Sequence, residues 1–184
     1  MRIEKTPSAA DLRAAEGRTI RDLIARDLGV LFCGINPGLY SAATGLHFAR
    51  PGNRFWPALA AAGFTASRLE PWQQRRELAA RRIGITNLVA RATAAAADLT
   101  DAELRAGRQR LERKVGRYRP RAVAIVGIGA YRTAFGRPDA TFGRQPEDLA
   151  GALLWVLPNT SGLNAHYQAA DFARAFGELR AAIG

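Results

Sequence analysis

The most informative stretch of the sequence is residues 30–38, Val30-Leu31-Phe32-Cys33-Gly34-Ile35-Asn36-Pro37-Gly38. An apolar run of this length that ends in Gly and Pro is typical of a buried strand followed by a loop. In an open parallel α/β sheet, ligands bind just beyond the carboxyl ends of the strands. We therefore expect Asn36 to lie at a substrate site, where its amide donates and accepts hydrogen bonds without ionising. Such a group positions water or a polar substrate rather than acting as a strong acid or base.

Apolar segments alternate with helical patterns along the rest of the chain. The expected strands are Val30–Gly34, Ile83–Val89, Ala122–Gly127 and Ala152–Leu157. The expected helices are Thr19–Asp27, Asn53–Ala62, Pro71–Arg82, Asp101–Tyr118 (with Thr100 as its N-cap), Gly129–Phe135 and Tyr167–Ile183. This alternation predicts an α/β fold with a mostly parallel central sheet covered on both faces. We expect a single domain over residues 1–184, in which residues 1 to about 11 form a loose N-terminal extension.

The net charge of the chain indicates which kind of molecule it binds. The formal net charge is +11, and all but two of the 27 basic residues are arginines. Such a charge favours a polyanionic partner, most simply nucleic acid, because arginine contacts phosphate with two parallel hydrogen bonds. Abundant arginine and alanine also fit a genome-wide codon preference, so the charge alone leaves both explanations open.

The composition also argues against several cofactors and locations. Cys33 is the only cysteine and there are only two histidines, which excludes a disulfide and argues against iron–sulfur and ordinary zinc sites. No apolar run is long enough to cross a bilayer, and the amino terminus lacks the apolar stretch of a secretory signal. We expect a cytoplasmic protein that needs no metal or other cofactor.

Two loops carry residues suited to a binding site. The first runs from Gly34 to about Phe55, and long irregular stretches of this kind are usually functional. Within it, Phe48 is either a core residue or a flat surface on which a base stacks. The second loop, residues 157–166, also follows an expected strand, so we expect it to open on the same edge of the sheet. There, Leu163 either packs into the core or enters a base stack as an apolar wedge.

Neither loop contains Asp or Glu, which argues against glycoside hydrolysis by paired carboxylates. The sequence also lacks the G-x-S-x-G motif of serine hydrolases and the G-x-x-x-x-G-K-[ST] phosphate-binding loop. Amide-rich loops on a basic protein suit a reaction whose leaving group departs as an anion. Backbone N–H groups can stabilise that anion while a side-chain amide holds water.

Two motifs in these loops resemble the signatures of the mismatch-specific uracil-DNA glycosylases, a family that includes the thymine-DNA glycosylases. The first is Gly34-Ile35-Asn36-Pro37-Gly38 followed by Gly45-x-x-Phe48-Ala49-x-Pro51-Gly52-Asn53-Arg54-Phe55-Trp56, and the second is Asn159-Thr160-Ser161-Gly162-Leu163-Asn164. The resemblance extends from about Thr19 to the end of the chain. It implies a three-layer α/β/α fold and a monofunctional enzyme that removes uracil from double-stranded DNA, especially opposite guanine.

The product implied by the resemblance is an abasic site, the substrate of base excision repair, and no cofactor is implied. We expect the protein to act on duplex DNA as a monomer, in the cytoplasm and associated with the nucleoid. Which damaged bases it prefers beyond uracil is open, because the dimensions of the pocket decide that.

The resemblance also implies roles for individual residues. Asn36 would orient the attacking water, and Phe48 would stack on the flipped base. Backbone groups of Ile35 and Phe48 would read the polar edge of the base, while Ser41 and Asn159 match positions on opposite sides of its pocket. The residues implied to contact the duplex are the wedge Leu163 and its neighbours Gly162 and Asn164.

The sequence departs from the family's pattern at two places. Thr160 stands where bacterial relatives commonly have proline, which predicts a less rigid second loop. Some relatives carry a carboxylate that assists water activation after the second strand, where this chain has Ala90-Arg91-Ala92-Thr93 and no acid before Asp98. Either Asn36 works alone, as we favour, or Asp98 reaches the site, or activity is reduced. The alternative functions are therefore a lesion- or mismatch-binding protein of the same fold with little catalysis, and a nucleotide-binding protein without a DNA role.

Overall fold

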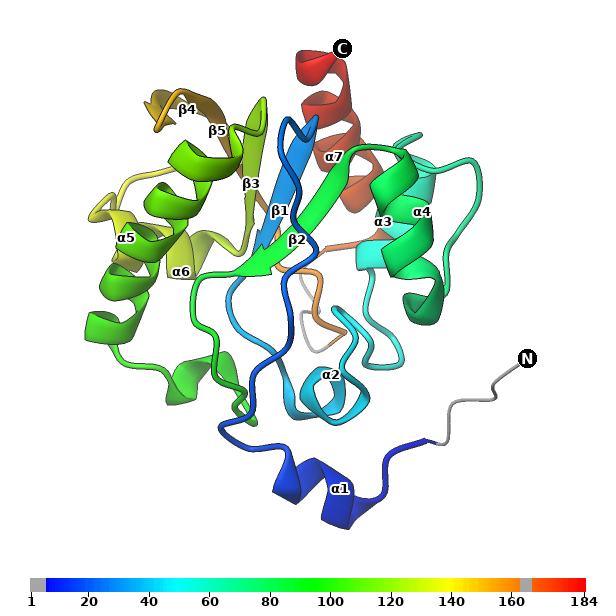
Figure 1. The fold of residues 1–184 in the computed structure, drawn as a ribbon. Helices are drawn as coiled ribbons and strands as arrows, with labels where there is room; N and C mark the ends of the chain where they lie inside the picture. The colour runs from blue at the N-terminus through cyan, green and yellow to red at the C-terminus, as the bar shows by residue number, and fades with distance from the viewer. Residues whose placement is uncertain (1–5, 163–166) are drawn as a thin grey trace.

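The computed structural model describes residues 6–162 and 167–184, and a five-stranded sheet forms its centre (Figure 1). The strands are β1 (Val30–Gly34), β2 (Ile83–Asn87), β3 (Ala122–Val126), β4 (Gly143–Leu149) and β5 (Ala152–Leu157). They lie in the order β2-β1-β3-β5-β4 and are parallel, except that β4 pairs antiparallel with β5. The parallel strands therefore end at the same edge of the sheet.

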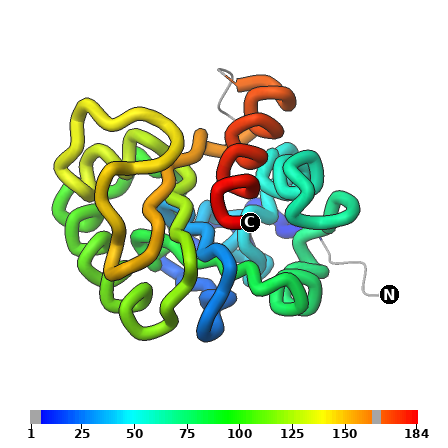
Figure 2. The backbone as a smooth tube through the Cα atoms, turned by 90° about the horizontal axis from the view of Figure 1, so that it is seen from above, coloured from blue at the N-terminus to red at the C-terminus, as the bar shows by residue number. Residues whose placement is uncertain are grey.

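Helices cover both faces of this sheet. They are α1 (Ala9–Ala14), α2 (Leu39–Thr44), α3 (Phe55–Ala61), α4 (Gln74–Ala80), α5 (Asp101–Tyr118), α6 (Ile128–Phe135) and α7 (Ala169–Ile183), with short 3-10 turns η1 (Pro71–Gln73) and η2 (Ala96–Asp98). Figures 1 and 2 show α5 and α6 on one face and α3, α4 and α7 on the other. Helices α1 and α2 lie beyond the carboxyl ends of the parallel strands. The predicted α/β fold with three layers is confirmed.

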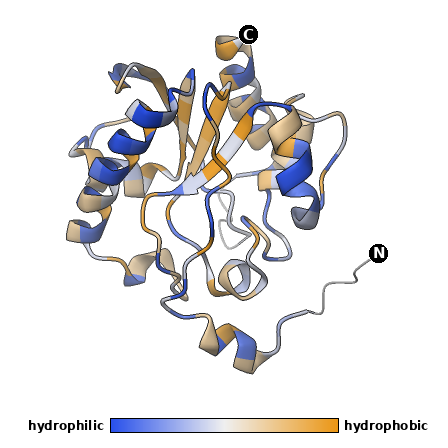
Figure 3. Ribbon diagram, viewed as in Figure 1, coloured by the Kyte–Doolittle hydropathy of each residue, from blue (hydrophilic) through white to orange (hydrophobic). Residues whose placement is uncertain are grey.

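The central strands are apolar throughout because each of their faces packs against helices (Figure 3). On one face, Val30 and Phe32 of β1 belong to a cluster with residues of α3, α4 and α7. On the other face, Leu31 and Cys33 pack with residues of α5 and α6. The ring of Phe32 lies edge-on to that of Phe55, with centroids 5.2 Å apart. This packing fixes β1, and with it the start of the first loop, in the middle of the sheet.

Most of the predicted elements are confirmed, with ends that differ by at most two residues. Helix α5 has the predicted bounds because its start is encoded locally. The hydroxyl of Thr100 accepts a hydrogen bond from the backbone N–H of Glu103 at 3.2 Å, and the Glu103 carboxylate accepts one from the Thr100 N–H at 2.9 Å. A reciprocal cap of this kind stabilises a helix by about 1 kcal/mol.

The helix predicted over Thr19–Asp27 is wrong. This segment is extended, and Leu23 exchanges both of its backbone hydrogen bonds with Ile85 in an isolated antiparallel bridge at the outer edge of β2. Asp27 then adopts a left-handed conformation with φ of 56°. Pairing with an open strand edge satisfies the same backbone groups that a helix would have used, so local composition could not decide between the two.

Several elements were not predicted. Strand β4 is polar, because it is an edge strand with one exposed side, and its sequence Gly-Arg-Gln-Pro-Glu-Asp-Leu carries no apolar run. Helix α2 lies inside the first loop, and η2 lies in an alanine-rich stretch without a helical period. Residues 9–11, which we assigned to a loose extension, form the start of α1.

Candidate active site

A cavity of about 390 Å³ opens at the carboxyl edge of the parallel strands. Three segments supply most of its lining: the first loop (residues 35–54), residues 93–96 after β2 and residues 159–161 of the second loop. Ile20, Asn87 and Val126 complete the described lining. The predicted base-site residues that line it are Ile35, Asn36, Ser41, Phe48 and Asn159. The two loops therefore open on the same edge of the sheet, as expected. Leu163 and Asn164 lie outside the described residues.

The amide of Asn36 is held in a defined orientation. Its Nδ2 donates to the backbone carbonyl of Arg91 at 3.0 Å and to Thr93 Oγ1 at 2.7 Å. A carbonyl only accepts hydrogen bonds, so the nitrogen and not the oxygen must face Arg91. The hydroxyl of Thr93 in turn donates to the carbonyl of Ala95 at 2.7 Å. Both donor sites of the amide are used, and Asn36 Oδ1 remains as the acceptor that this side chain can offer to a water in the cavity.

No Asp or Glu is among the described residues that line the cavity. Asp98 is not part of this lining, and its Oδ2 accepts a hydrogen bond from the backbone N–H of Ala95 at 2.9 Å. Glu103 is paired with Arg91 at 2.5 Å, and this hydrogen bond is the largest cause that lowers the pKa of the Glu103 carboxyl to about 2. The carboxylates of Asp98 and Glu103 therefore stabilise the segment that carries Thr93.

Phe48 is both a packed residue and a wall of the cavity. Its ring stacks on that of Phe55 with centroids 4.0 Å apart and planes 17° apart, and the half-buried side chain lines the cavity. Its backbone is in the left-handed region, with φ of 50°. The indole of Trp56 donates to the carbonyl of Phe48 at 3.2 Å. The N–H of Phe48 has no hydrogen-bond partner in the described part of the chain, so it is a donor available to a ligand.

Two further polar residues of the cavity are held by hydrogen bonds within their own loops. Ser41 is buried, and its Oγ accepts a hydrogen bond from the backbone N–H of Ala49 at 3.2 Å, which closes the first loop on itself. Asn159 Oδ1 accepts one from the N–H of Ser161 at 2.9 Å. This local turn at the start of the second loop sets the direction in which the side chain of Asn159 leaves the backbone.

Asn87 lines the cavity but was not predicted as a site residue. It is the last residue of β2, next to Gly34 at the end of β1. A side chain on Gly34 would collide with Asn87, because a Cβ there would lie 2.5 Å from Asn87 Oδ1. Glycine at position 34 therefore leaves room for a second amide beside Asn36. The rule that singles out Asn36, a polar residue at the carboxyl end of a buried strand, could have found it.

Arg54 joins the first loop to the second. Its guanidinium donates to the carbonyls of Ser161 at 2.6 Å and Tyr167 at 2.9 Å, and its backbone N–H donates to the carbonyl of Thr160 at 2.9 Å. Gly162 lies against the first loop as well, since a Cβ on it would come within 2.9 Å of the carbonyl oxygen of Gly52. Residues 160–162 of the second loop are therefore positioned by the first loop.

Comparisons with known proteins identify the family of this chain and a solved structure of similar fold. The family described as the Uracil DNA glycosylase superfamily matches residues 22–180. The chain belongs to the uracil DNA glycosylase superfamily. A solution structure of a protein from Methanosarcina acetivorans, provisionally described as a uracil DNA glycosylase, is similar in fold with a TM-score of 0.59 and 19% sequence identity. The match covers 89% of this chain and 98% of that one.

In this member of the uracil DNA glycosylase superfamily, His47 lies buried at the cavity wall. Its Nε2 lies 3.0 Å from the carbonyl oxygen of Arg21, which only accepts, so Nε2 carries a proton. Burial lowers the pKa of His47 below its usual 6.5, although the hydrogen bond to Arg21 opposes this shift. The imidazole is therefore neutral at physiological pH and serves to tie residue 21 to the first loop.

Neither Cys33 nor a cluster of metal ligands forms a second reactive centre among the described residues. Burial raises the pKa of the Cys33 thiol, which therefore remains protonated in the core. Within residues 6–162 and 167–184, no three His, Cys, Asp or Glu side chains are grouped as a metal site would require. None of the helices in these ranges combines the length and apolar character needed to cross a bilayer.

Thr93 was not predicted as a site residue either, for a different reason than Asn87. Thr93 lies in an alanine-rich stretch with no periodic signal. It reaches Asn36 because its backbone N–H donates to the carbonyl of Pro37 at 3.2 Å, which holds the two segments together. Nothing in the local sequence marks this contact.

Proposed function

We propose that this protein is a monofunctional, mismatch-specific DNA glycosylase that hydrolyses the N-glycosidic bond of uracil in duplex DNA, especially opposite guanine. The observation that carries the proposal is the fixed amide of Asn36, whose Nδ2 is used by Arg91 and Thr93 and whose Oδ1 can accept a hydrogen bond from water. The product is an abasic site. The reaction requires no metal or cofactor, and we expect a monomer that acts on chromosomal DNA in the cytoplasm.

Base recognition would combine stacking with hydrogen bonds from fixed donors. A uracil in a duplex must be flipped out of the stack, at a cost of a few kcal/mol that is smaller for a mismatched pair. The cavity of about 390 Å³ is of the size that holds a small ligand. Phe48 would stack on the base, and the free N–H of Phe48 would donate to one of its carbonyl oxygens. The amide of Asn87 is suited to the remaining polar edge, because it can donate and accept.

Bond cleavage would proceed through charge separation. As the bond from C1′ to the uracil nitrogen breaks, its electron pair leaves with the base and the sugar becomes oxocarbenium-like. Preorganised N–H dipoles stabilise the negative charge on the departing uracil. Asn36 Oδ1 accepts a hydrogen bond from the water that attacks C1′. As the new bond from C1′ to oxygen forms, this water releases one of its two protons to solvent or to the departed base. A neutral amide is a weak base, so the chemical step is expected to be slow.

Contacts with the duplex would come from the second loop. Leu163 would fill the gap left by the flipped base, and the backbone groups of Gly162 and Asn164 would contact the unpaired guanine. The net charge of +11 supports an affinity for the phosphate backbone. Ser41 and Asn159 would close the pocket around the base, from opposite sides.

The test is a single-turnover assay with labelled duplexes that contain uracil opposite guanine or opposite adenine, followed by hot alkali to cleave abasic sites. We expect alkali-dependent breakage that is faster opposite guanine and is lost in Asn36→Ala. Equal rates opposite guanine and adenine would contradict mismatch preference while leaving the glycosylase intact. Binding to the mismatch without breakage in either protein would instead identify a lesion-binding protein, the alternative favoured by the absence of a carboxylate from the described cavity lining.

A further inference from the structure

A second cavity, of about 350 Å³, lies between α4 and the extended residues 21–28. Figure 1 shows this extended segment, in dark blue, passing in front of β2 with α4 beside it. Among the described residues, none lines both this cavity and the active-site cavity. Its apolar lining comes from both elements and from β2, and includes Leu23, Leu28, Leu78 and Ile83. We call it the arginine groove, after the residues that surround it.

Four exposed arginines line the groove: Arg21, Arg26, Arg75 and Arg82. None of them forms an ion pair within residues 6–162 and 167–184, although arginines elsewhere on the surface are often paired with nearby carboxylates. Arg82 is held in place by hydrogen bonds to the backbone carbonyl of Asp27. Unpaired guanidinium groups around one concavity repel one another, so an anionic occupant would relieve that repulsion.

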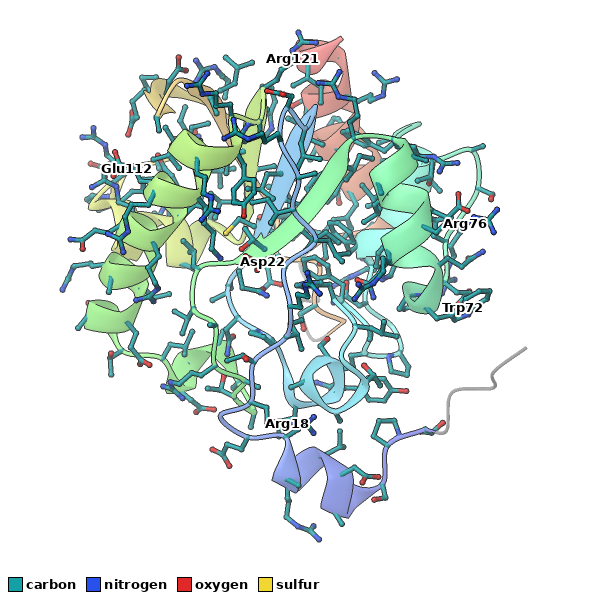
Figure 4. The ribbon with its side chains drawn as sticks, viewed as in Figure 1. Arg18, Asp22, Trp72, Arg76, Glu112 and Arg121 are labelled. Carbon is teal, nitrogen blue, oxygen red and sulfur yellow. The ribbon has the colours of Figure 1, made fainter. Side chains whose placement is uncertain are left out.

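Asp22 is the only acid among the described residues that line the groove, and its charge is already compensated. Asp22, which Figure 4 labels, lies on the extended segment next to β2. Its Oδ2 accepts a hydrogen bond from Lys114 Nζ at 2.5 Å, and its Oδ1 accepts one from Thr86 Oγ1 at 2.9 Å. The carboxylate therefore does not compensate the arginines, and the groove has a surplus of positive charge.

The extended segment also presents an open strand edge. Leu23 directs its N–H and carbonyl toward Ile85, at 2.9 Å and 2.8 Å. In an extended chain, adjacent residues direct these groups to the opposite side. Accordingly, the N–H groups of Asp22 and Ile24 have no hydrogen-bond partner in the described part of the protein. Such an edge can accept another extended chain by backbone pairing.

We propose that the arginine groove binds an extended, acidic segment of a partner protein, with an apolar side chain of that segment in the groove and carboxylates on the arginines. Such a ligand would use all three features of the groove. Its extended backbone would pair with the open strand edge, its apolar side chain would contact the apolar floor, and its carboxylates would bind the guanidinium groups. This site would recruit the protein to a partner and is independent of the reaction proposed above.

Other occupants fit less well. A nucleic acid would satisfy the arginines, but its sugar–phosphate backbone brings no apolar side chain for the floor and no strand edge for Asp22 and Ile24. A second copy of this chain is also disfavoured, because the chain carries only 16 acidic residues against 27 basic ones and has no acidic run. An acidic partner segment is the occupant that uses all of the groove.

The test is a fluorescence-anisotropy titration with a short labelled peptide in which Asp alternates with Leu. Two control peptides have Ser in place of Leu, or N-methylated backbone positions that cannot pair with a strand edge. We expect saturable binding of the first peptide and affinity about tenfold weaker for both controls. Equal binding of all three peptides, or no binding at all, would overturn the proposal.

Variants locate the site. In Arg26→Ser/Arg75→Ser, we expect the affinity for the Asp-Leu peptide to fall about tenfold, since two exposed charge contacts are lost. Ala79→Glu, on the exposed side of α4, should weaken binding similarly because it places a carboxylate among the arginines. The matched control, Arg110→Ser/Arg113→Ser, removes two exposed arginines from α5 and should bind as wild type.

Three results would reject the assignment. Equal losses in the groove variant and in the α5 control would show attraction to net charge alone. Displacement of the peptide by undamaged duplex DNA, in the same concentration range in which that DNA binds the free protein, would mark the groove as a nucleic-acid surface. Weakened peptide binding in Asn36→Ala would place the peptide in the active-site cavity. Uracil excision should be unchanged in the groove variants, which separates a failure here from a failure of the proposed reaction.

Discussion

The two loops that line the candidate active-site cavity are held in different ways. In the first loop, the amide of Asn36 is fixed by a distant segment, through Thr93 and the carbonyl of Arg91. In the second loop, Asn159 is fixed by a turn two residues long, and the neighbouring residues 160 and 161 are held by Arg54 of the first loop. The difference indicates a hierarchy: β1 and the segment after β2 position the first loop, and the first loop positions the second.

The excision rate should depend much more on the amide of Asn36 than on that of Asn159. Asn36→Ala should lower the single-turnover rate of uracil excision by about 100-fold or more, because in the proposed reaction the attacking water would lose its orienting group. Asn159→Ala should cost only about tenfold, since it alters one wall of the base pocket. Binding of a uracil–guanine duplex, measured by anisotropy, should change little in Asn36→Ala. Equal rate losses for the two variants would contradict the assignment of water to Asn36.

The next effect tests whether the second loop depends on the first. Arg54→Ala leaves the carbonyls of Ser161 and Tyr167 without their donor and should lower the excision rate by about tenfold. It should also lower the free energy of unfolding by about 2 kcal/mol, because the half-buried carbonyls lose hydrogen bonds to a charged group. Arg54→Lys, which can satisfy one carbonyl, should recover part of the rate. An unchanged rate with lowered stability would restrict Arg54 to a structural role.

A smaller effect distinguishes two threonines, one beside each loop. Thr93→Val removes the hydroxyl that orients Asn36 and should lower the excision rate by about fivefold to tenfold, whereas Thr93→Ser should retain it. Thr160 is buried, and its Oγ1 has no hydrogen-bond partner in the described structure. Thr160→Val should therefore raise the free energy of unfolding by about 1 kcal/mol. Thermal melts and single-turnover rates of both variants check these outcomes.

The smallest effect concerns pH. Burial holds the pKa of His47 below 6.5 in the folded protein, so the unfolded chain binds a proton more readily than the folded one. The stabilising contribution of the neutral imidazole is complete above pH 6.5 and is lost progressively as the pH falls toward the lowered pKa. Asp22 and Lys114 also act on His47, with opposite signs. His47→Gln, which can still donate to the carbonyl of Arg21, should reduce the pH dependence of denaturant unfolding in this range.

The sequence predicted those parts of the fold whose signals are local. Strand β1 has its predicted bounds because an apolar run between Gly29 and Gly34 allows few other structures in water, and α5 begins where Thr100 and Glu103 cap each other. The error at Thr19–Asp27 has the opposite origin. Its composition suits a helix, but Ile85 offers an unpaired strand edge, and only the assembled sheet creates that edge.

The same division applies to the candidate site. The residue pattern alone places Asn36 and Asn159 after strands that end at one edge of the sheet, because parallel strands share their carboxyl edge. The orientation of the Asn36 amide is set only in the folded protein, since Thr93 is remote along the chain and contacts Asn36 through a hydrogen bond that no local pattern encodes. The same holds for Asn87 beside Gly34 and for Arg54 against the second loop. Local residue types fix which groups reach an edge, whereas the hydrogen bonds that aim them depend on which segments the folded core brings together.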